Sequence, residues 1–229
     1  NKIPPEEQAR LGELTIGMAG LSVGAATAVT LAMEGVGGTL RLADFDRLAL
    51  SNLNRLRASV LDVGVNKAML TARAILEMNP YARLEVFPEG IPDEGLEDFM
   101  AGLDVLLEET DDLYMKVKLR EAARARRIPV IMETSDRGLI DVERFDLEPD
   151  RPVLHGLAGD VDADSLKGLS QSDKVPIVLR IVGEQSVSPR AAASMVEVGT
   201  PLRSWPQLAS AVSLGAGSAA DAVRRIALG

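Results

Sequence analysis

The feature that most constrains the fold is residues 14–55, LTIGMAGLSVGAATAVTLAMEGVGGTLRLADFDRLALSNLNR. This stretch predicts a short strand, a glycine-rich turn, a helix of small residues, and a second strand that ends at Asp44 and Asp46. A strand that runs through a tight turn into a helix leaves unpaired backbone N–H groups at the helix N-terminus, where they can bind phosphate. We therefore expect an α/β domain built around a phosphate-binding turn.

The same stretch contains twenty consecutive residues without a formal charge, 14–33, so a membrane span has to be considered. Small and hydroxyl residues are frequent in it, and Glu13 and Glu34 flank it where a span would have basic anchors. A buried strand, turn and helix explains it better, and we expect no membrane association. The beginning of the chain, NKIPPEEQAR, also lacks the apolar segment of a signal peptide.

Periodic apolar patterns predict the remaining elements. Strands are expected at 39–43, 83–87, 104–107, 129–132 and 175–182, with a strand that leaves the parallel core at 138–145. Helices are expected at 66–78, 94–100, 113–127, 189–198 and 207–228, and a long loop at 148–174. This alternation predicts an α/β fold: a Rossmann-like, doubly wound, mainly parallel sheet with helices on both faces and a C-terminal strand and helix extension.

The order of elements indicates one domain at 14–229, preceded by a linker or truncated N-terminus at 1–13. Within the domain we expect a nucleotide-binding core at 14–135, a substrate or crossover region at 136–187, and a C-terminal helical segment at 188–229. The chain has 229 residues, 46% of them hydrophobic and only 3% aromatic. That composition suits helices packed on parallel strands better than a β-sandwich.

The charge and the cysteine content exclude several functions. With a net charge of −9 and scattered basic residues, binding to nucleic acid is not expected. The chain has no cysteine, which excludes disulfides, thiolate zinc sites and a cysteine nucleophile. A reducing compartment is compatible with this composition, and we expect the cytoplasm.

The turn alone is a weak signal. Gly17-Met18-Ala19-Gly20-Leu21-Ser22 is a diluted Gly-x-Gly-x-x-Gly sequence, which fits a packing turn as well as a phosphate-binding turn. Asp44 follows at the end of the second strand, where a carboxylate can accept hydrogen bonds from a ribose hydroxyl. It comes 27 residues after Gly17, farther than is typical of a dinucleotide site. An NAD-dependent oxidoreductase is therefore a weaker alternative.

The decisive signal is an ordered set of polar motifs. The set comprises Asp44-Phe45-Asp46, Ser51-Asn52-Leu53-Asn54-Arg55, Gly64 with Lys67, Asn79-Pro80 and Thr110-Asp111-Asp112, with Glu34-Gly35-Val36-Gly37 at the first helix end. Over about residues 14–135 it resembles the ThiF/MoeB superfamily, adenylation domains related to ubiquitin-activating enzymes. The resemblance implies an adenylyltransferase that uses ATP and Mg²⁺: a carboxylate attacks the α-phosphate, an acyl-adenylate forms, and pyrophosphate leaves.

The resemblance also implies roles for individual residues. Asp44 would hold the ribose, with Asp46 beside it, and Asn52 would orient the phosphates. Arg55 and Lys67 would be catalytic, because they would neutralise the phosphate charge. Taken singly, these two cations could equally be surface charges, and Asp46 could simply end its strand.

The turn and the metal site are assigned in the same way. Gly17, Gly20 and Ser22 would contact the nucleotide, and Asp111 would hold Mg²⁺ and so act in catalysis. Asp111 taken alone could be an ordinary helix N-cap. Ala19 and Ser22 replace two glycines of the family's Gly-x-Gly-Gly-x-Gly turn, which adds side-chain bulk where the backbone would approach phosphate.

The absence of cysteine excludes a thioester step, so the implied enzyme only adenylates. Its partner would be a carboxylate on a protein, peptide or small molecule, and the resemblance implies a homodimer. Residues 188–229 resemble the tail of larger proteins in which a ThiF-like domain precedes a flavin nitroreductase-like domain. The alternative function is accordingly a degenerate, non-catalytic nucleotide-binding or scaffold domain that serves a fused or partner nitroreductase.

Four further residues are candidates for lesser roles. Asp136 and Arg137 follow the fifth strand at the ligand edge, where they would recognise a substrate carboxylate or simply form a salt-bridged loop. His155 is explained better as a loop residue than as a general base, since no triad partner is evident. Trp205 is expected to anchor the last helix to the core.

Overall fold

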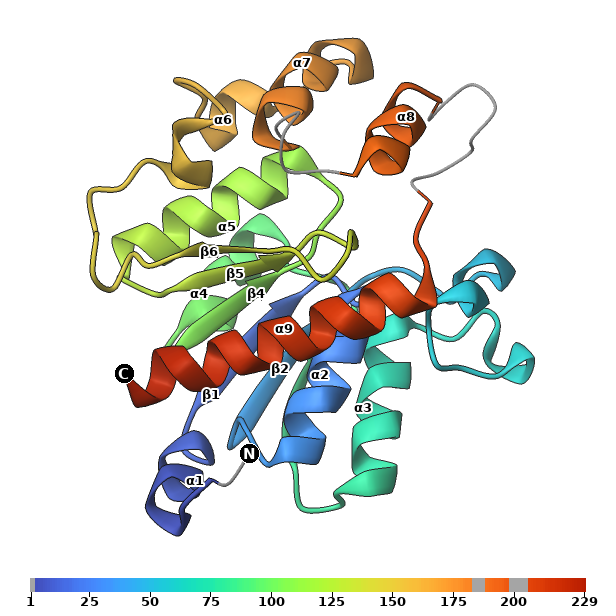
Figure 1. Ribbon diagram of the computed structural model, residues 1–229, viewed down its shortest axis with the longest axis vertical. Helices are drawn as coiled ribbons and strands as arrows, with labels where there is room; N and C mark the ends of the chain where they lie inside the picture. The colour runs from blue at the N-terminus through green and yellow to red at the C-terminus, as the bar shows by residue number, and fades with distance from the viewer. Residues whose placement is uncertain (1–2, 183–187, 198–205) are drawn as a thin grey trace.

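A six-stranded sheet forms the centre of the molecule in the computed structural model, which describes residues 3–182, 188–197 and 206–229 (Figure 1). The strands are β1 (Thr15–Ala19), β2 (Thr39–Ala43), β3 (Arg83–Phe87), β4 (Val105–Glu108), β5 (Val130–Glu133) and β6 (Ile140–Glu143). Their order is β3-β2-β1-β4-β5-β6, with β6 antiparallel and the others parallel. The order reverses between β1 and β4, and ligands bind at such a switch point in doubly wound sheets.

Helices cover both faces of the sheet (Figure 1). One face carries α1 (Pro5–Leu11), α2 (Gly24–Glu34), α3 (Lys67–Met78) and α9 (Ala209–Leu228). The other carries α4 (Leu96–Met100), α5 (Leu113–Ala125), α6 (Ala163–Leu166) and α7 (Gln171–Val182), and α8 (Pro189–Glu197) lies between α7 and α9 in the chain. The predicted doubly wound α/β fold is therefore confirmed.

Strand alternation divides the core into two layers. In β1, Ile16 and Met18 join the apolar cluster under α2, α3 and α9, whereas Ala19 joins the cluster under α5. In β4, Leu107 joins the first cluster and Leu106 the second. Because both faces are buried, these parallel strands are nearly continuous apolar runs.

One predicted strand is wrong: residues 175–182 belong to the helix α7. A continuous apolar run does not by itself distinguish a buried strand from a helix. In the structure Ile177, Val178 and Ile181 pack on the core while Leu179 is exposed, which is the spacing of one helix face.

Other predictions on the C-terminal half are partly confirmed. The strand expected at 138–145 is β6, and the helices expected at 189–198 and 207–228 are α8 and α9. The loop expected at 148–174 contains the 3₁₀ turn η4 (Val153–Gly156) and the short helix α6. Trp205 lies outside the described residues. Nowhere in the described chain is there a helix with the length and apolarity that a membrane span requires.

Candidate nucleotide site and adjoining pocket

The turn that follows β1 passes tightly between the ends of two neighbouring strands. Gly20 has φ +93°, and a Cβ atom there would lie 2.5 Å from the carbonyl oxygen of Glu109, so only glycine fits. Its N–H donates to the carbonyl of Ala43 at 2.9 Å. Gly17 lies three residues earlier, inside β1, where a Cβ would be 2.7 Å from Leu103 Cδ1. Its smallness therefore serves packing, and the turn begins at Gly20.

Asp44 joins the end of β2 to this turn. Its buried carboxylate accepts from Leu21 N through Oδ2 at 2.7 Å and from Asp46 N through Oδ1 at 2.8 Å. Burial raises the pKa of Asp44, and the hydrogen bond from Leu21 opposes that effect. Each carboxylate oxygen keeps a second lone pair, so the side chain can still accept a hydroxyl donor.

Lys67 and Asn52 are both engaged within the protein. Lys67, the first residue of α3, is buried, and its Nζ lies 2.7 Å from Asp46 Oδ2. Asn52 lies in the 3₁₀ turn η1 (Leu50–Asn54), where its Oδ1 accepts from Ala49 N at 2.9 Å. Both side chains stabilise the loops after β2, and Lys67 retains donors for another acceptor.

Arg55, Ser22 and Asp111 converge beside the turn, although they are far apart in the sequence. Arg55 Nε donates to Ser22 Oγ at 3.2 Å, and its Nη1 donates to Asn54 Oδ1 at 2.9 Å. No carboxylate among the described residues forms an ion pair with Arg55 within 4 Å. Partial burial lowers the pKa of Arg55, while the negative charge of Asp111 opposes this shift. The guanidinium is therefore available to an anion at the turn.

Asp111 is exposed, whereas its neighbour Asp112 has a structural role. Asp112 caps α5 by accepting from Met115 N at 3.4 Å and lies 3.4 Å from Lys174 Nζ. Within the described residues no group of three or more acidic or histidine side chains could hold a metal ion. Asp111 fits Mg²⁺ only in the common arrangement in which one carboxylate, phosphate oxygens and waters share the ion.

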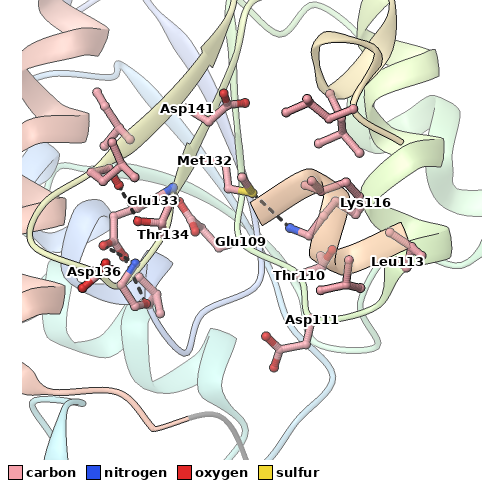
Figure 2. A pocket seen from close by; sticks show the side chains of 18 of the residues that line it. Glu109, Thr110, Asp111, Leu113, Lys116, Met132, Glu133, Thr134, Asp136 and Asp141 are labelled. Carbon is pink, nitrogen blue, oxygen red and sulfur yellow. Dashed lines mark hydrogen bonds between the residues drawn. The ribbon is translucent and has the colours of Figure 1, made fainter. Parts of the chain in front are cut away.

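A pocket of about 360 Å³ opens next to this site, between the C-terminal ends of β4 and β5 and the η4 and α7 segments (Figure 2). Val23 of the turn and Asp111 both line it, so it adjoins the predicted nucleotide site. In Figure 2 Glu133 and Asp136 lie on the left, Lys116 on the right, and Asp111 below.

Two acidic side chains share one wall of the pocket. Glu109 is buried, and its Oε1 accepts from Glu133 N at 2.7 Å. Burial, reinforced by the charge of Glu133, raises the pKa of Glu109. Burial also raises the pKa of Glu133 to about 7, although hydrogen bonds from Ser135 oppose it.

His155 also lines the pocket, and it has the partner that the sequence did not reveal. Its Nε2 lies 2.5 Å from Asp141 Oδ1, and Arg151 Nε donates to its Nδ1 at 3.1 Å. The expectation that no partner is near is therefore wrong, because β6 places Asp141 beside η4. Both ring nitrogens have partners, so His155 suits a structural role in which it links β6 to η4.

Of the two residues expected to recognise a carboxylate, only Asp136 lines the pocket. Its Oδ2 accepts from Ser188 N at 2.7 Å and lies 3.4 Å from Arg137 Nε. The sequence reasoning missed Glu109 and Glu133. Their positions in the sequence could have indicated both, since each stands at the C-terminal end of a buried parallel strand, where ligands bind.

Comparison with known proteins gives a family match and curated relatives. The model of the ThiF family matches residues 1–187. The chain is 56% identical over 227 residues to an uncharacterised protein of Mycobacterium tuberculosis, covering 99% of this chain and 32% of that protein. It is 29% identical over 147 residues to the molybdopterin-synthase adenylyltransferase of Haemophilus influenzae, covering 63% of this chain and 59% of the relative. The chain thus spans less than two thirds of either relative.

Solved structures share the fold. The crystal structure of PaaA superposes with a TM-score of 0.68 and 24% identity, covering 99% of this chain and 68% of that one. The tRNA N6-threonylcarbamoyladenosine dehydratase of E. coli, solved in complex with ATP, gives a TM-score of 0.66 and 19% identity, covering 98% and 89%. At these identities the likeness concerns the fold alone.

Proposed function

The chain belongs to the ThiF family, and on that premise we propose that it is an ATP-dependent adenylyltransferase that activates a carboxylate. A carboxylate oxygen attacks the α-phosphorus of ATP, the bond to the bridging oxygen breaks, and pyrophosphate leaves with that electron pair. The product is an acyl-adenylate. Because the chain has no cysteine, no thioester follows on this chain.

The observation that carries this proposal is the convergence of Arg55 and Ser22 at the turn after β1, 3.2 Å apart, with Asp111 close enough to influence the guanidinium. An arginine that has no ion-pair partner in the described part of the chain, beside a turn and a helix N-terminus, suits phosphate oxygens. A dinucleotide site would give this cation no purpose. ATP-bound relatives of the same fold support the choice of nucleotide.

Each remaining residue has a role that its present contacts permit. Asp44 accepts from a ribose hydroxyl with its free lone pairs, and Asn52 holds the loop that carries Arg55. Lys67 donates to phosphate while it stays paired with Asp46. Mg²⁺, bound through Asp111, would neutralise phosphate charge. The protein itself contributes positioning and electrostatic stabilisation.

Isothermal titration of the protein with ATP and Mg²⁺, followed by ATP–pyrophosphate exchange with candidate carboxylates, tests the proposal. We expect Arg55→Ala to weaken ATP binding at least about tenfold, because one charged phosphate contact is lost. Arg83→Ala removes the same charge at the other end of the sheet and is expected to leave binding unchanged.

Other results would favour other functions. ATP binding without exchange for any carboxylate would indicate the non-catalytic scaffold instead, an alternative favoured by the bulk of Ser22 and the pairing of Lys67. Equal ATP binding by Arg55→Ala and the parent protein would contradict the assigned site. The homodimer, the cytoplasmic location and a nitroreductase-like partner domain stay predictions, and sedimentation velocity tests the first of them.

A further inference from the structure

The pocket beside Asp111 is acidic, and its own basic groups are already neutralised. Its lining includes five acidic residues, Glu109, Asp111, Glu133, Asp136 and Asp141. Among the described residues that line the pocket, only Lys116 and His155 are basic. Lys116 Nζ lies 2.8 Å from Glu108 Oε2, and His155 is paired with Asp141. Acidic groups therefore outnumber basic groups in the described lining of the pocket.

Glu109 shows where a ligand would be held. Its side chain is nine-tenths buried, and its Oε1 accepts from Glu133 N. Its Oε2 accepts from no donor in the described part of the chain, yet it is not sealed in the protein: of the described side chains, only Thr27 has a fully enclosed polar atom without a partner. Glu109 Oε2 therefore opens into the pocket as an unused acceptor.

Glu133 adds a second incompletely bonded carboxyl group on the same wall. Its Oε1 accepts from Ser135 N at 2.6 Å, but its Oε2 has only a long contact of 3.4 Å with Ser135 Oγ. Two neighbouring carboxyl groups repel one another when both are charged. A cation placed between them removes that repulsion and supplies the missing donors.

The lining of the pocket also contains apolar side chains. Met132, Leu154, Val178 and Ile181 line the pocket, and its volume of about 360 Å³ matches a small aliphatic group. A methylene chain can pack against these side chains while its charged end reaches the two glutamates. A substrate carboxylate would be disfavoured at the same position, because the ionisable groups of the described lining that have no ion pair are all acidic.

The pocket also adjoins the nucleotide site. Val23 lies in the turn after β1, Asp111 lies at the end of β4, and both line the pocket. A molecule seated in it would therefore lie beside the turn, where the Glu109 side chain packs against the start of α2, its Cγ 3.4 Å from the Cβ position of Gly24. We propose that the carboxylate activated by this protein belongs to a molecule that also carries a protonated amine or guanidinium on an aliphatic stem, and that Glu109 and Glu133 bind this cation. The inference rests on the proposed adenylation function and names its substrate class.

Calorimetric binding of matched pairs tests the proposal without depending on catalysis. The pairs are 6-aminohexanoate with hexanoate, leucine with 4-methylpentanoate, and an N-acetylated tripeptide ending in lysine with the same peptide ending in norleucine. We expect at least one cationic member to bind about tenfold more tightly than its neutral partner. The first two pairs represent free amino acids and the third represents the C-terminal end of a peptide. Comparing the pairs therefore shows whether the substrate is a small molecule or a peptide. Equal binding within every pair would overturn the proposal.

Variants assign the preference to the two glutamates. Glu109→Gln and Glu133→Gln keep the oxygen atoms that accept backbone N–H groups, and together they should reduce the cationic preference to less than about threefold. ATP affinity should not change. Glu77→Gln removes an exposed carboxylate at the far end of α3 and is the matched control. A preference retained in the double variant would overturn the assignment.

Pyrophosphate exchange separates this inference from the proposed function. If cationic ligands bind through the two glutamates but no carboxylate supports exchange, adenylation is wrong and the cation site stands. If exchange occurs with neutral carboxylates as readily as with cationic ones, adenylation stands and the cation site is wrong.

Discussion

Glu133 is a residue whose ionisation opposes folding. Its pKa is raised from 4.5 to about 7 by burial, so the folded protein retains the proton over a range in which the unfolded chain has lost it. Stability therefore falls as the pH rises from 4.5 to 7 and is level above that range. One pKa unit is worth about 1.4 kcal/mol. We expect Glu133→Gln to raise the free energy of unfolding by about 1–3 kcal/mol at pH 8 and to change it little at pH 4.5.

Urea unfolding at several pH values checks this prediction. Glutamine keeps an oxygen for the N–H of Ser135, so the variant removes the charge and preserves the hydrogen bond. A stabilisation that is the same at pH 4.5 and pH 8 would mean that Glu133 is not the group responsible.

Gly20 tests how strictly the turn depends on one backbone conformation. Alanine at Gly20 would adopt an unfavourable positive φ and place its Cβ 2.5 Å from the carbonyl oxygen of Glu109. We expect Gly20→Ala to cost about 2 kcal/mol of stability or more and to abolish measurable ATP binding. Gly102→Ala is an informative comparison, because Gly102 also has positive φ but nothing lies within 4 Å of its Cβ position. Thermal unfolding and calorimetry measure the stability and the ATP affinity of both variants. Equal losses in the two variants would contradict the steric argument.

The motifs of the sequence point to residues for the proposed nucleotide site, but not to the contacts that those residues make. Arg55, Lys67 and Asp111 stand in motifs whose order is readable along the chain. That Arg55 meets Ser22, and Lys67 meets Asp46, depends on side-chain conformations that no local pattern encodes. The two glutamates of the pocket come together only because β4 and β5 are neighbours in the sheet.

The helix α9 contains a glycine whose role is to admit a side chain from the sheet. A Cβ atom on Gly215 would lie 2.1 Å from Glu133 Oε1 and 2.2 Å from its Cγ. Alanine normally favours a helix over glycine by about 1 kcal/mol. We expect Gly215→Ala to destabilise the protein by about 1–3 kcal/mol nonetheless, because the buried Glu133 side chain has to move and lose its contacts with Ser135.

Gly217 in the same helix provides the control. It is exposed, and nothing lies within 4 Å of a Cβ placed there, so Gly217→Ala should stabilise the protein by about 0.5–1 kcal/mol. Thermal unfolding measures both. If the two substitutions changed stability in the same direction, the close approach of α9 to Glu133 would be refuted.

At the scale of elements, strands were easier to predict than the segment over the pocket. The boundaries of β2 and β3 follow directly from short apolar or alternating runs between turn signals. The sequence of α7 predicts a strand because its β-branched residues favour one locally, and Pro176 is unfavourable inside a helix. Its helical state depends on packing against the core on the α5 face of the sheet, which is tertiary information.

Across the whole molecule, a buried ionic network connects the sheet to the segment that covers the pocket. Arg120 of α5 is fully buried between Glu108 at the end of β4 and Glu143 of β6, with its Nε 2.5 Å from Glu143 Oε2. Glu143 Oε1 accepts from Leu154 N in η4 at 2.6 Å. Four elements are thereby joined by one side chain and its partners.

Removing Arg120 should therefore destabilise the protein far more than removing an arginine from a surface ion pair. Arg120→Met leaves the buried Glu143 without its arginine partner and the buried Glu108 with Lys116 alone, and we expect a loss of about 3–5 kcal/mol in the free energy of unfolding at pH 7. Arg126→Met breaks a surface ion pair with Glu97 and a hydrogen bond to the carbonyl of Ala122, and it should cost less than about 1 kcal/mol. Urea unfolding of the two variants measures the difference.

The pH dependence of the stability lost in Arg120→Met shows whether the lost ion pairs cause it. Burial alone would raise the pKa of Glu108, but Lys116 and Arg120 outweigh it and hold that pKa at about 2, against 4.5 for the ordinary group. The stability that Glu108 contributes is complete above pH 4.5 and is lost as the pH falls toward 2. Without Arg120 the carboxylate gains its proton at a higher pH, so the difference between Arg120→Met and the parent protein should narrow as the medium becomes acidic. If the difference in the free energy of unfolding stayed constant from pH 7 to pH 3, Arg120 would stabilise the protein through the packing of its methylenes. The four elements would then be held together by van der Waals contacts and not by ion pairs.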